Sequence, residues 1–389
     1  MAMKVIIIGA SGPGLFTAYL LAKGGCEVEV YERMPTLGWP PRTIIVTSKL
    51  NEILEFIPEE AIINQVNYLE LFSKSSSARV SLSCPDLVVE RKKLIELLAR
   101  MAAAAGAKIN LGHQFEGLAR LGKKVVVGLK DLETKEERQI PTDILVGADG
   151  TLSAVSRAVS RNGHRLAALI QARVHLPDSG RKDTCKVWFV SPQTKYFYWL
   201  IPESNEAAVV GLIAEEAHRA QASLMKFLQE RQLQPLEFQS ALVPMHRFEY
   251  GGNLLDPDGN IFFVGDAAAQ VKTTTVGGVV TGLYGARALA NAVLNGKNYY
   301  GELRWLNREL NLHLLVRHIL NRFNNENYDE LIQMLEGGLK EVIEGWTRDE
   351  LSQSFWRLIW KEPRLITLGA RALLRSMLPG LRLDLLFHR

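Results

Sequence analysis

A glycine-rich turn between a short apolar strand and a helix constrains the fold of this chain most strongly. Residues Lys4 to Ile8 (KVIII) are continuous and β-branched, which predicts a buried strand that ends at Gly9. Residues Leu15 to Lys23 predict a helix that ends at Gly24, and Glu27 to Tyr31 (EVEVY) predict a second strand. This order of elements within about 30 residues is typical of a dinucleotide-binding βαβ unit.

The turn reads GASGPG from Gly9 to Gly14 and differs from the GxGxxG pattern only at Ser11. The first glycine permits a tight turn, the second lets the backbone approach a pyrophosphate, and the third permits close packing of helix on strand. Glu32 follows the turn by about 20 residues and can accept hydrogen bonds from ribose hydroxyls. The residues expected to line a nucleotide are Gly9, Ser11, Pro13, Gly14 and Glu32.

Two later segments repeat the order of strand, turn and helix. They are TDILVGADGTLSAVSR (142–157) and NIFFVGDAAAQVKTTTVGG (260–278). An aspartate at the end of a parallel strand can bind a ribityl hydroxyl, and the helix N-terminus that follows can face a flavin or its pyrophosphate. Each turn alone is also compatible with an ordinary helix cap. Three such turns on three strands favour FAD as the cofactor.

Composition narrows the class of protein. A length of 389 residues predicts two or three domains, and 47% hydrophobic with 23% charged residues indicates an ordinary globular chain. The net charge of +4 is too small to indicate nucleic-acid binding. Cys26, Cys84 and Cys185 lie far apart, so we expect neither a disulfide framework nor a metal site. No apolar run is long enough to predict a spanning helix, and we expect a cytoplasmic protein.

With these motifs in place, the sequence resembles the FAD-dependent oxidoreductases of the p-hydroxybenzoate-hydroxylase-like fold, and within them the geranylgeranyl reductase family. GASGPG with Glu32-Arg33, GADGTLSAV and GDAAAQVKTTTVGG carry the resemblance, which covers nearly the whole chain. It implies that Glu32 holds the adenosine ribose, that Asp266 holds the ribityl chain and phosphates, and that Arg91 lies near the FAD. It adds to the cofactor-binding set Arg33, Arg42, Thr43, Gly277, Gly278 and Val279.

The middle of the chain predicts a different kind of sheet. Runs such as KVWFV (186–190) and EAAVVGLIAE (206–215) favour antiparallel strands. In FYWLIP (197–202), aromatic rings spaced by two residues share one strand face and can line an apolar slot. The segment resembles the prenyl reductase pattern YxWxFP, which makes Phe197, Tyr198, Trp199 and Pro202 candidate substrate-binding residues and Tyr198 a candidate proton donor. An ordinary core strand and the halogenase pattern WxWxIP fit the segment as well.

Three positions depart from the reductase family's motifs. Thr43 stands where a cysteine is common in the loop from Gly38, Thr273 replaces a proline, and Val276 replaces the first of three glycines. After Gly278 the chain predicts helices, among them 308–323 and 327–343. Residues 355–389 carry seven Lys and Arg against two acids, interleaved with leucine. That pattern fits either a surface helix on anionic lipid or a helix packed on its own protein.

We therefore expect an α/β fold with a Rossmann-type FAD-binding domain (1–160 and 245–300), an antiparallel-sheet substrate domain (161–244) and a helical C-terminal region (301–389). The expected activity is reduction of C=C bonds in a geranylgeranyl-type isoprenoid, with electrons from a reduced ferredoxin-like protein or NAD(P)H. An FAD-dependent monooxygenase (hydroxylase) is the alternative, followed by a halogenase or a non-catalytic flavoprotein. We expect no nucleic-acid partner, and possible peripheral membrane contact is assigned to the C-terminal region.

Overall fold

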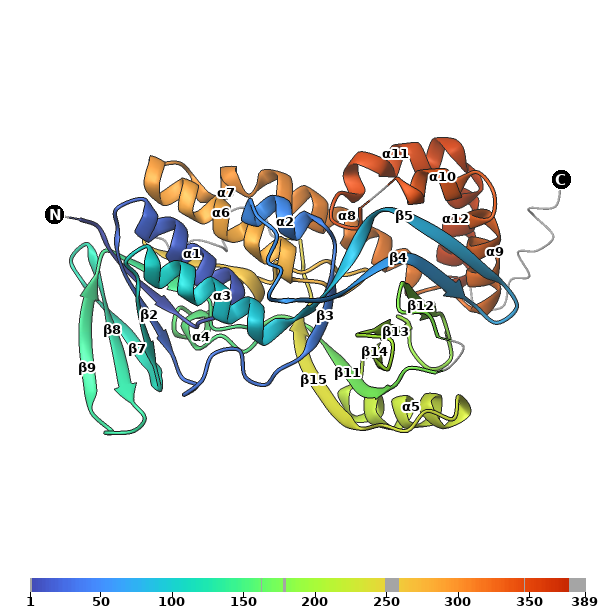
Figure 1. Cartoon of the computed structure of the whole chain (residues 1–389). Helices are drawn as coiled ribbons and strands as arrows, with labels where there is room; N and C mark the ends of the chain where they lie inside the picture. Colours follow the sequence, from blue (N-terminus) through green and yellow to red (C-terminus); the bar gives the residue numbers. More distant parts are fainter. Residues whose placement is uncertain (1, 162, 178–179, 249–258, 346, 378–389) are drawn as a thin grey trace. The chain divides into compact units, whose positions relative to one another are not determined.

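The computed structural model describes residues 2–161, 163–177, 180–248, 259–345 and 347–377 (Figure 1). The chain divides into two compact units. Unit 1 contains Met1–Ile63, Val89–Leu166 and Val243–Asn311, and unit 2 contains Asn64–Val88, Ala167–Leu242 and Leu312–Arg389. The predicted domain limits at 160 and 245 lie near two of these boundaries, whereas residues 64–88, which we expected in the FAD-binding domain, fall in unit 2.

Unit 1 is built on a parallel five-stranded sheet with the order β16-β10-β1-β2-β6. Strand β1 lies in the middle, and the chain continues to β2 on one side and to β10 on the other. The carboxyl ends of strands on either side of such a switch are where nucleotides bind in open α/β sheets. The bounds are β1 Lys4–Ile8, β2 Glu27–Glu32, β6 Lys108–Leu111, β10 Ile144–Gly147 and β16 Ile261–Phe263.

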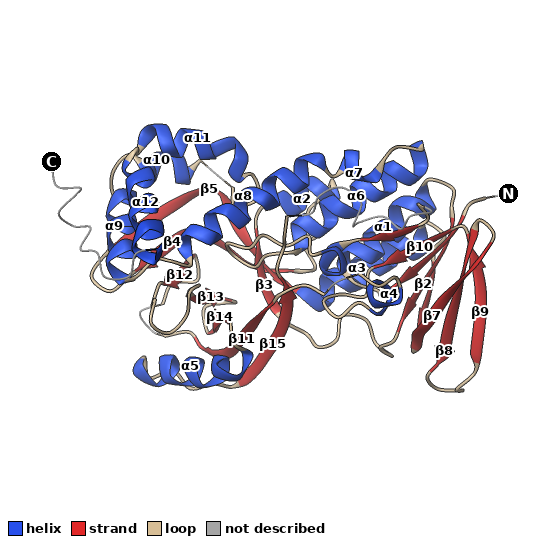
Figure 2. Cartoon of the chain, turned by 180° about the vertical axis from the view of Figure 1, so that it is seen from behind, coloured by secondary structure: helices blue, strands red, loops and turns tan. Residues whose placement is uncertain are grey.

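Two layers cover this sheet, as Figures 1 and 2 show. One face carries the helices α1 (Gly12–Lys23), α3 (Arg91–Ala104) and α6 (Val279–Asn295). The other carries α4 and an antiparallel sheet of β7, β8 and β9, with bounds Ala154–Ala158, His113–Leu121, Lys124–Asp131 and Glu137–Thr142. The shorter elements of unit 1 are β3 Thr43–Val46, α2 Lys49–Leu54, η1 Gly265–Ala268 and α7 Tyr299–Glu302.

Unit 2 contains a sheet with the order β15-β11-β14-β13-β12-β4-β5. Neighbours from β11 to β12 pair antiparallel, and β12 pairs with β4 in parallel. Helix α5 (Ala217–Glu230) packs on one face through Leu224, Phe227 and Leu228. The bounds are β4 Ile62–Phe72, β5 Ser77–Glu90, β11 Leu166–His175, β12 Thr184–Trp188, β13 Tyr198–Pro202, β14 Ala207–Ala214 and β15 Glu237–Pro244.

The described part of the carboxyl-terminal region is helical, as predicted; residues 378–389 lie outside the described residues. The helices are α8 Arg304–Leu320, α9 Asn325–Leu335, α10 Leu339–Glu344, α11 Leu351–Lys361 and α12 Arg364–Met377. Within unit 2 they enclose a core around Tyr328 and Ile332 that also contains Ala78 of β5. The predicted fold class is therefore confirmed. In the described part of the chain, none of the helices combines the length and apolar character that crossing a membrane requires.

Candidate cofactor site

The first turn requires glycine at its two outer positions. Gly9 has φ +102°, and a β-carbon there would lie 2.5 Å from the carbonyl oxygen of Ala148. A β-carbon on Gly14 would lie 2.5 Å from the carbonyl oxygen of Gly9. Ser11 has an ordinary φ of −74° and caps α1, because its Oγ accepts a hydrogen bond from the Gly14 amide at 3.2 Å. The departure from GxGxxG at Ser11 therefore replaces a glycine with a favoured helix cap.

Glu32 ties the end of β2 to the glycine turn. Its Oε2 accepts a hydrogen bond from the Ala10 amide at 2.8 Å, and its Oε1 accepts one from the Met34 amide at 2.9 Å. Each carboxylate oxygen keeps a second lone pair for another donor. The predicted ribose acceptor is thus held by the backbone next to the turn, whereas its neighbour Arg33 is exposed.

The third turn lies against the first. Gly265 has φ +66°, and a β-carbon there would lie 2.9 Å from Cγ of Pro13. A β-carbon on Gly282 of α6 would lie 2.6 Å from the same atom. Asp266 in turn lies beside Gly278, where a β-carbon would come within 3.1 Å of its Oδ1. Pro13 thus packs into a space that glycines leave open, and this packing brings the two nucleotide motifs together.

Two partly buried arginines, Arg42 and Arg91, join the motifs electrostatically. Burial lowers the pKa of Arg91. The carboxylates of Asp266, Glu90 and Glu32 oppose this shift. Burial and the neighbouring Arg91 lower the pKa of Arg42 to about 10, and Asp266 opposes this shift. Because Arg91 responds to both Glu32 and Asp266, the ends of β2 and β16 converge on one charged site. Arginine is well suited to phosphate there, since it stays cationic when buried.

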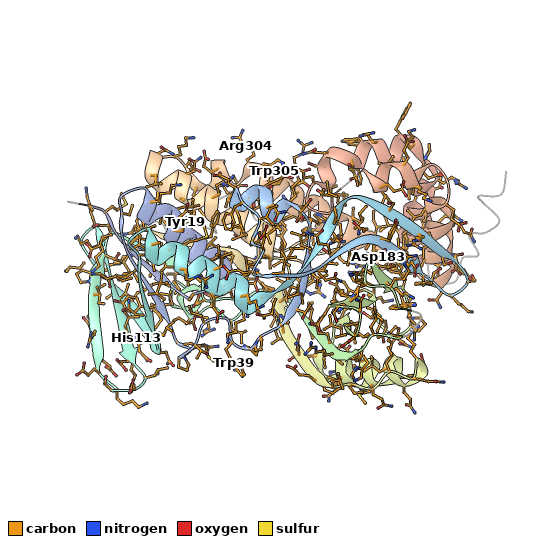
Figure 3. The ribbon with its side chains drawn as sticks, in the orientation of Figure 1. Tyr19, Trp39, His113, Asp183, Arg304 and Trp305 are labelled. Atoms are coloured by element: carbon orange, nitrogen blue, oxygen red, sulfur yellow. The ribbon has the colours of Figure 1, made fainter. Side chains whose placement is uncertain are left out.

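The loop between β2 and β3 shapes this charged region. Arg91 is the first residue of α3, and its guanidinium donates hydrogen bonds to the carbonyl oxygens of Gly38 at 3.2 Å and Pro40 at 3.5 Å. Trp39 of the same loop is 56% exposed and projects outward in Figure 3. Thr43, which stands where the family often has cysteine, is buried. The loop thus orients the Arg91 side chain.

Burial raises the pKa of Asp266, and Arg42, Arg91 and a hydrogen bond from Thr151 act against this rise. Asp149 of the second motif shows the same direction of pKa shift, again because of burial. Its Oδ2 accepts hydrogen bonds from the amides of Ala154 at 2.6 Å and Val155 at 3.1 Å. Its buried Oδ1 has no partner among the described residues. That oxygen is available to a hydroxyl or N–H group of a ligand.

A buried hydrogen-bond chain that sequence reasoning missed supports the Gly265-Asp266 turn. The side chain of Gln270 accepts from the Gly265 amide at 2.7 Å and donates to the Tyr299 hydroxyl at 3.2 Å. Tyr299 donates to the carbonyl oxygen of Phe263 at 2.9 Å. Gly285 leaves room for this amide, because a β-carbon there would lie 2.0 Å from Gln270 Oε1. The only sign of this hydrogen-bond chain in the sequence is Gln270, whose side-chain amide follows a run of alanines.

The loop from Lys272 to Gly278 closes on itself before α6 begins at Val279. The Lys272 amide donates to the Gly277 carbonyl oxygen at 3.1 Å, and the Val276 amide donates to the Lys272 carbonyl oxygen at 2.8 Å. Val276 has φ +53°, a region that favours glycine, at a position where the reductase family has glycine. Lys272 and Thr273 are buried in this loop. Gly277, Gly278 and Val279 thus lie at the N-terminus of a 17-residue helix.

In unit 2, the aromatic strand points its rings to two faces. Tyr198 is fully buried and stacks on Phe227 of α5, with 4.1 Å between the ring centroids. Its hydroxyl donates a hydrogen bond to Gln193 Oε1 at 2.6 Å. Burial raises the Tyr198 pKa to about 12. Trp199, on the alternate face, donates from Nε1 to Gln171 Oε1 at 3.3 Å.

The remaining two predicted substrate residues flank these rings. The Phe197 ring lies 6.3 Å from that of Trp199, edge to face. Pro202 accepts a hydrogen bond at its carbonyl oxygen from Asn64 at 2.9 Å. The four predicted substrate residues therefore do not share one face, because side chains alternate along a strand.

Unit 1 fits FAD on several independent grounds. Close glycine turns border two helix N-termini, and Arg42 and Arg91 are partly buried cations suited to phosphate. Glu32 is a fixed acceptor, and Asp149 has an unpartnered buried oxygen. These features of fold and site define the class of protein as FAD-dependent oxidoreductases. The FAD binding domain family matches residues 2–298, and the chain belongs to this family.

Relatives confirm the predicted resemblance to geranylgeranyl reductases, and a solved structure shares the fold. The chain is 26% identical to digeranylgeranylglycerophospholipid reductase 2 of Methanothermobacter thermautotrophicus, over 87% of this chain and 92% of that protein. It is 26% identical to digeranylgeranylglycerophospholipid reductase of Methanocaldococcus jannaschii, over 93% of this chain and 96% of that protein. A geranylgeranyl bacteriochlorophyll reductase-like protein from Thermoplasma acidophilum has the same fold, with a TM-score of 0.75 and 17% identity. The match covers 95% of this chain and 100% of that protein.

Proposed function

We propose that the protein is an FAD-dependent reductase that hydrogenates C=C bonds in the geranylgeranyl-type chain of a prenyl lipid or prenyl diphosphate. The observation that carries the proposal is geometric: Pro13 packs against Gly265, and this packing brings the turn held by Glu32 and the turn of Asp266 to one nucleotide site. Relatives that are named as reductases of digeranylgeranylglycerophospholipid match nearly the whole chain and support this choice of substrate class. Bound FAD, once reduced, supplies the hydride for such a reaction.

The residues of unit 1 bind and orient the cofactor. Glu32 accepts hydrogen bonds from sugar hydroxyls, and Arg42 and Arg91 balance the phosphate charge. Asp266 and Asp149 offer carboxylate oxygens to hydroxyl or N–H groups. Arg33, Thr43, Gly277, Gly278 and Val279 belong to the proposed cofactor-binding set as well.

An isolated C=C bond offers no polar handle, so we propose that apolar packing selects the substrate. Phe197 and Trp199 present rings on one side of the aromatic strand and are the proposed contacts with the isoprenoid. Tyr198 and Pro202 support this strand. The stacking of Tyr198 on Phe227 and its hydrogen bond to Gln193 favour a packing role over proton donation.

We propose that the electrons come from outside the chain, either from a reduced ferredoxin-like protein or from NAD(P)H. We further propose that the protein works in the cytoplasm at the surface of a membrane, with its C-terminal region in contact with lipid. A prenyl-lipid substrate has its hydrocarbon tails in a bilayer, so an enzyme that reduces them needs access to that surface.

Anaerobic reoxidation of the flavin tests the proposed function. The FAD-loaded protein is reduced with dithionite and mixed without oxygen with a geranylgeranyl glycerolipid. A reductase is expected to recover the absorption of oxidised flavin as the lipid accepts electrons. If the flavin stays reduced until oxygen is admitted, and an aromatic substrate then stimulates oxygen uptake, the alternative monooxygenase reaction describes the protein instead.

A further inference from the structure

Helix α11 presents two tryptophans to solvent. Trp356 is 70% exposed and Trp360 is 80% exposed, and the two lie one turn apart on the same side of the helix. Large aromatic side chains are rarely left this exposed on both turns of a short surface helix, because each adds apolar area that water solvates poorly. The exposed pair therefore indicates a surface with a binding role.

The opposite side of α11 already supplies the packing of the helix. Leu351 and Ser354 are buried, and Leu358 packs against the core of the C-terminal helices. The helix is thus anchored in unit 2 without Trp356 or Trp360. We define the outer face of α11 as Gln353, Trp356, Arg357, Trp360 and Lys361, all of which are exposed.

The charged side chains of α11 and α12 themselves are all positive. Helices α11 and α12 carry five cations and no acid: Arg357, Lys361, Arg364, Arg371 and Arg375. Glu362 lies in the link between the two helices, and Arg371 is engaged by Glu330 of α9. Glu362 is buried and engaged by Arg364 at 2.6 and 2.7 Å. Lys361 lies 3.4 Å from Glu341 of α10, a solvent-exposed pair that holds it only weakly. Arg357 and Lys361 therefore offer positive charge beside the two tryptophans.

Helix α12 adds further exposed apolar side chains. Its Ile366 is 57% exposed and its Leu374 is 36% exposed, two turns apart. Tryptophan at the level of lipid headgroups, lysine and arginine at the phosphates, and aliphatic side chains between them are the features of a helix that lies in a membrane interface. A protein partner would meet the tryptophans as well, but it would not require that α11 and α12 carry only cations.

We propose that the outer face of α11 docks the protein on an anionic lipid bilayer, with Trp356 and Trp360 in the interface and Arg357 and Lys361 on lipid phosphates. The biological role of this docking rests on the proposed function, because a prenyl-lipid substrate must be drawn from a bilayer. Its structural basis is independent of that function.

The test is binding of the full-length, FAD-loaded protein to vesicles, measured by flotation at low and high salt. One set of vesicles contains phosphatidylcholine alone and the other contains phosphatidylglycerol as well. The wild type is expected to bind the anionic vesicles more tightly, and added salt is expected to weaken that binding. The double variant Trp356→Ser/Trp360→Ser is expected to bind at least about tenfold more weakly. Arg357→Gln/Lys361→Gln is expected to lose the preference for anionic lipid.

Leu121→Ser is the matched control, because Leu121 is 67% exposed on the β7–β9 sheet, away from α11 in the sequence. It is expected to bind vesicles like the wild type, and flavin absorption reports whether each variant is folded. The inference is overturned if the wild type does not bind anionic vesicles or if the tryptophan variant binds unchanged. It is equally overturned if sedimentation velocity shows a wild-type dimer that the tryptophan variant loses, since the face would then join two copies.

Activity on a detergent-dispersed geranylgeranyl lipid separates the two proposals. The tryptophan variant is expected to keep wild-type activity in detergent and to lose it on vesicles. Loss of vesicle binding with activity retained in detergent supports docking through α11. A wild type that binds vesicles but reduces no lipid in detergent contradicts the proposed function and leaves the docking result standing.

Discussion

Glu32 and Asp266 place carboxylates at the same site in two different surroundings. Glu32 accepts two backbone hydrogen bonds at the edge of the glycine turn. Asp266 interacts electrostatically with Arg42 and Arg91, and burial raises its pKa. The sequence predicted both residues because each ends a strand of a recognisable βα unit. It could not predict their surroundings, which depend on residues far along the chain.

Glu32→Gln is expected to lower FAD affinity by about 10- to 100-fold, because hydrogen bonds to a charged group contribute about 1.5–3 kcal/mol. The glutamine also replaces one acceptor oxygen with a donor opposite the Ala10 or Met34 amide. The change in affinity is measured by titrating FAD-free protein and following flavin fluorescence. Glu27→Gln, an exposed position on the same strand, is the control and should bind FAD normally.

The variant Asp266→Asn tests how the Asp266 carboxyl group changes the free energy of unfolding with pH. Because the pKa of Asp266 in the fold lies above its ordinary value of 3.8, the stability from its neutral form is fully present below that pH. That stability is lost as the pH rises through the folded-state pKa. FAD-free wild type is therefore expected to lose stability relative to Asp266→Asn from about pH 4 upward. Urea unfolding across this range measures the difference, and parallel curves for the two proteins would refute the assignment.

Tyr198→Phe separates packing from proton donation. The variant keeps the ring that stacks on Phe227 and loses only the hydroxyl. We expect the reduction rate to stay within about threefold and the free energy of unfolding to fall by about 1 kcal/mol for the lost hydrogen bond. A fall in rate of about 100-fold or more would instead identify the hydroxyl as the acid that sequence reasoning first considered.

At the scale of elements, the first βαβ unit was predictable almost to the residue. Lys4–Ile8 is the predicted strand, and α1 begins three residues before the predicted start because Ser11 caps it. The apolar runs and glycines of this unit act locally, so sequence alone suffices. The predicted helical stretch 327–343 forms two helices, because Gly337 and Gly338 interrupt it.

Ser11 provides the prediction at this scale. Ser11→Ala is expected to lower the free energy of unfolding by about 1 kcal/mol, because the Gly14 amide loses its cap. Ser11→Gly, which restores the GxGxxG pattern, is expected to cost only a few tenths of a kcal/mol. Urea unfolding of both variants measures the difference. Equal losses would show that Ser11 does not act as a cap.

At the scale of the whole molecule, long-range pairings limited what sequence could reveal. Residues 64–88 belong to unit 2, where β4 pairs with β12 more than 100 residues further along the chain. Strand β4 (IINQVNYLELF) mixes apolar and polar side chains without regular alternation, so its sequence gave no strong strand signal. The link from Gln270 to Tyr299 likewise joins residues that no local motif connects.

Product analysis tests the central claim most directly. FAD-loaded protein, a geranylgeranyl lipid and a chemical reductant are incubated without oxygen, and the lipid is examined by mass spectrometry. The account predicts that the lipid gains two hydrogen atoms for each double bond reduced and that protein without FAD leaves it unchanged. A lipid that stays unsaturated with the FAD-loaded protein, or that gains an oxygen atom once air is admitted, would contradict it.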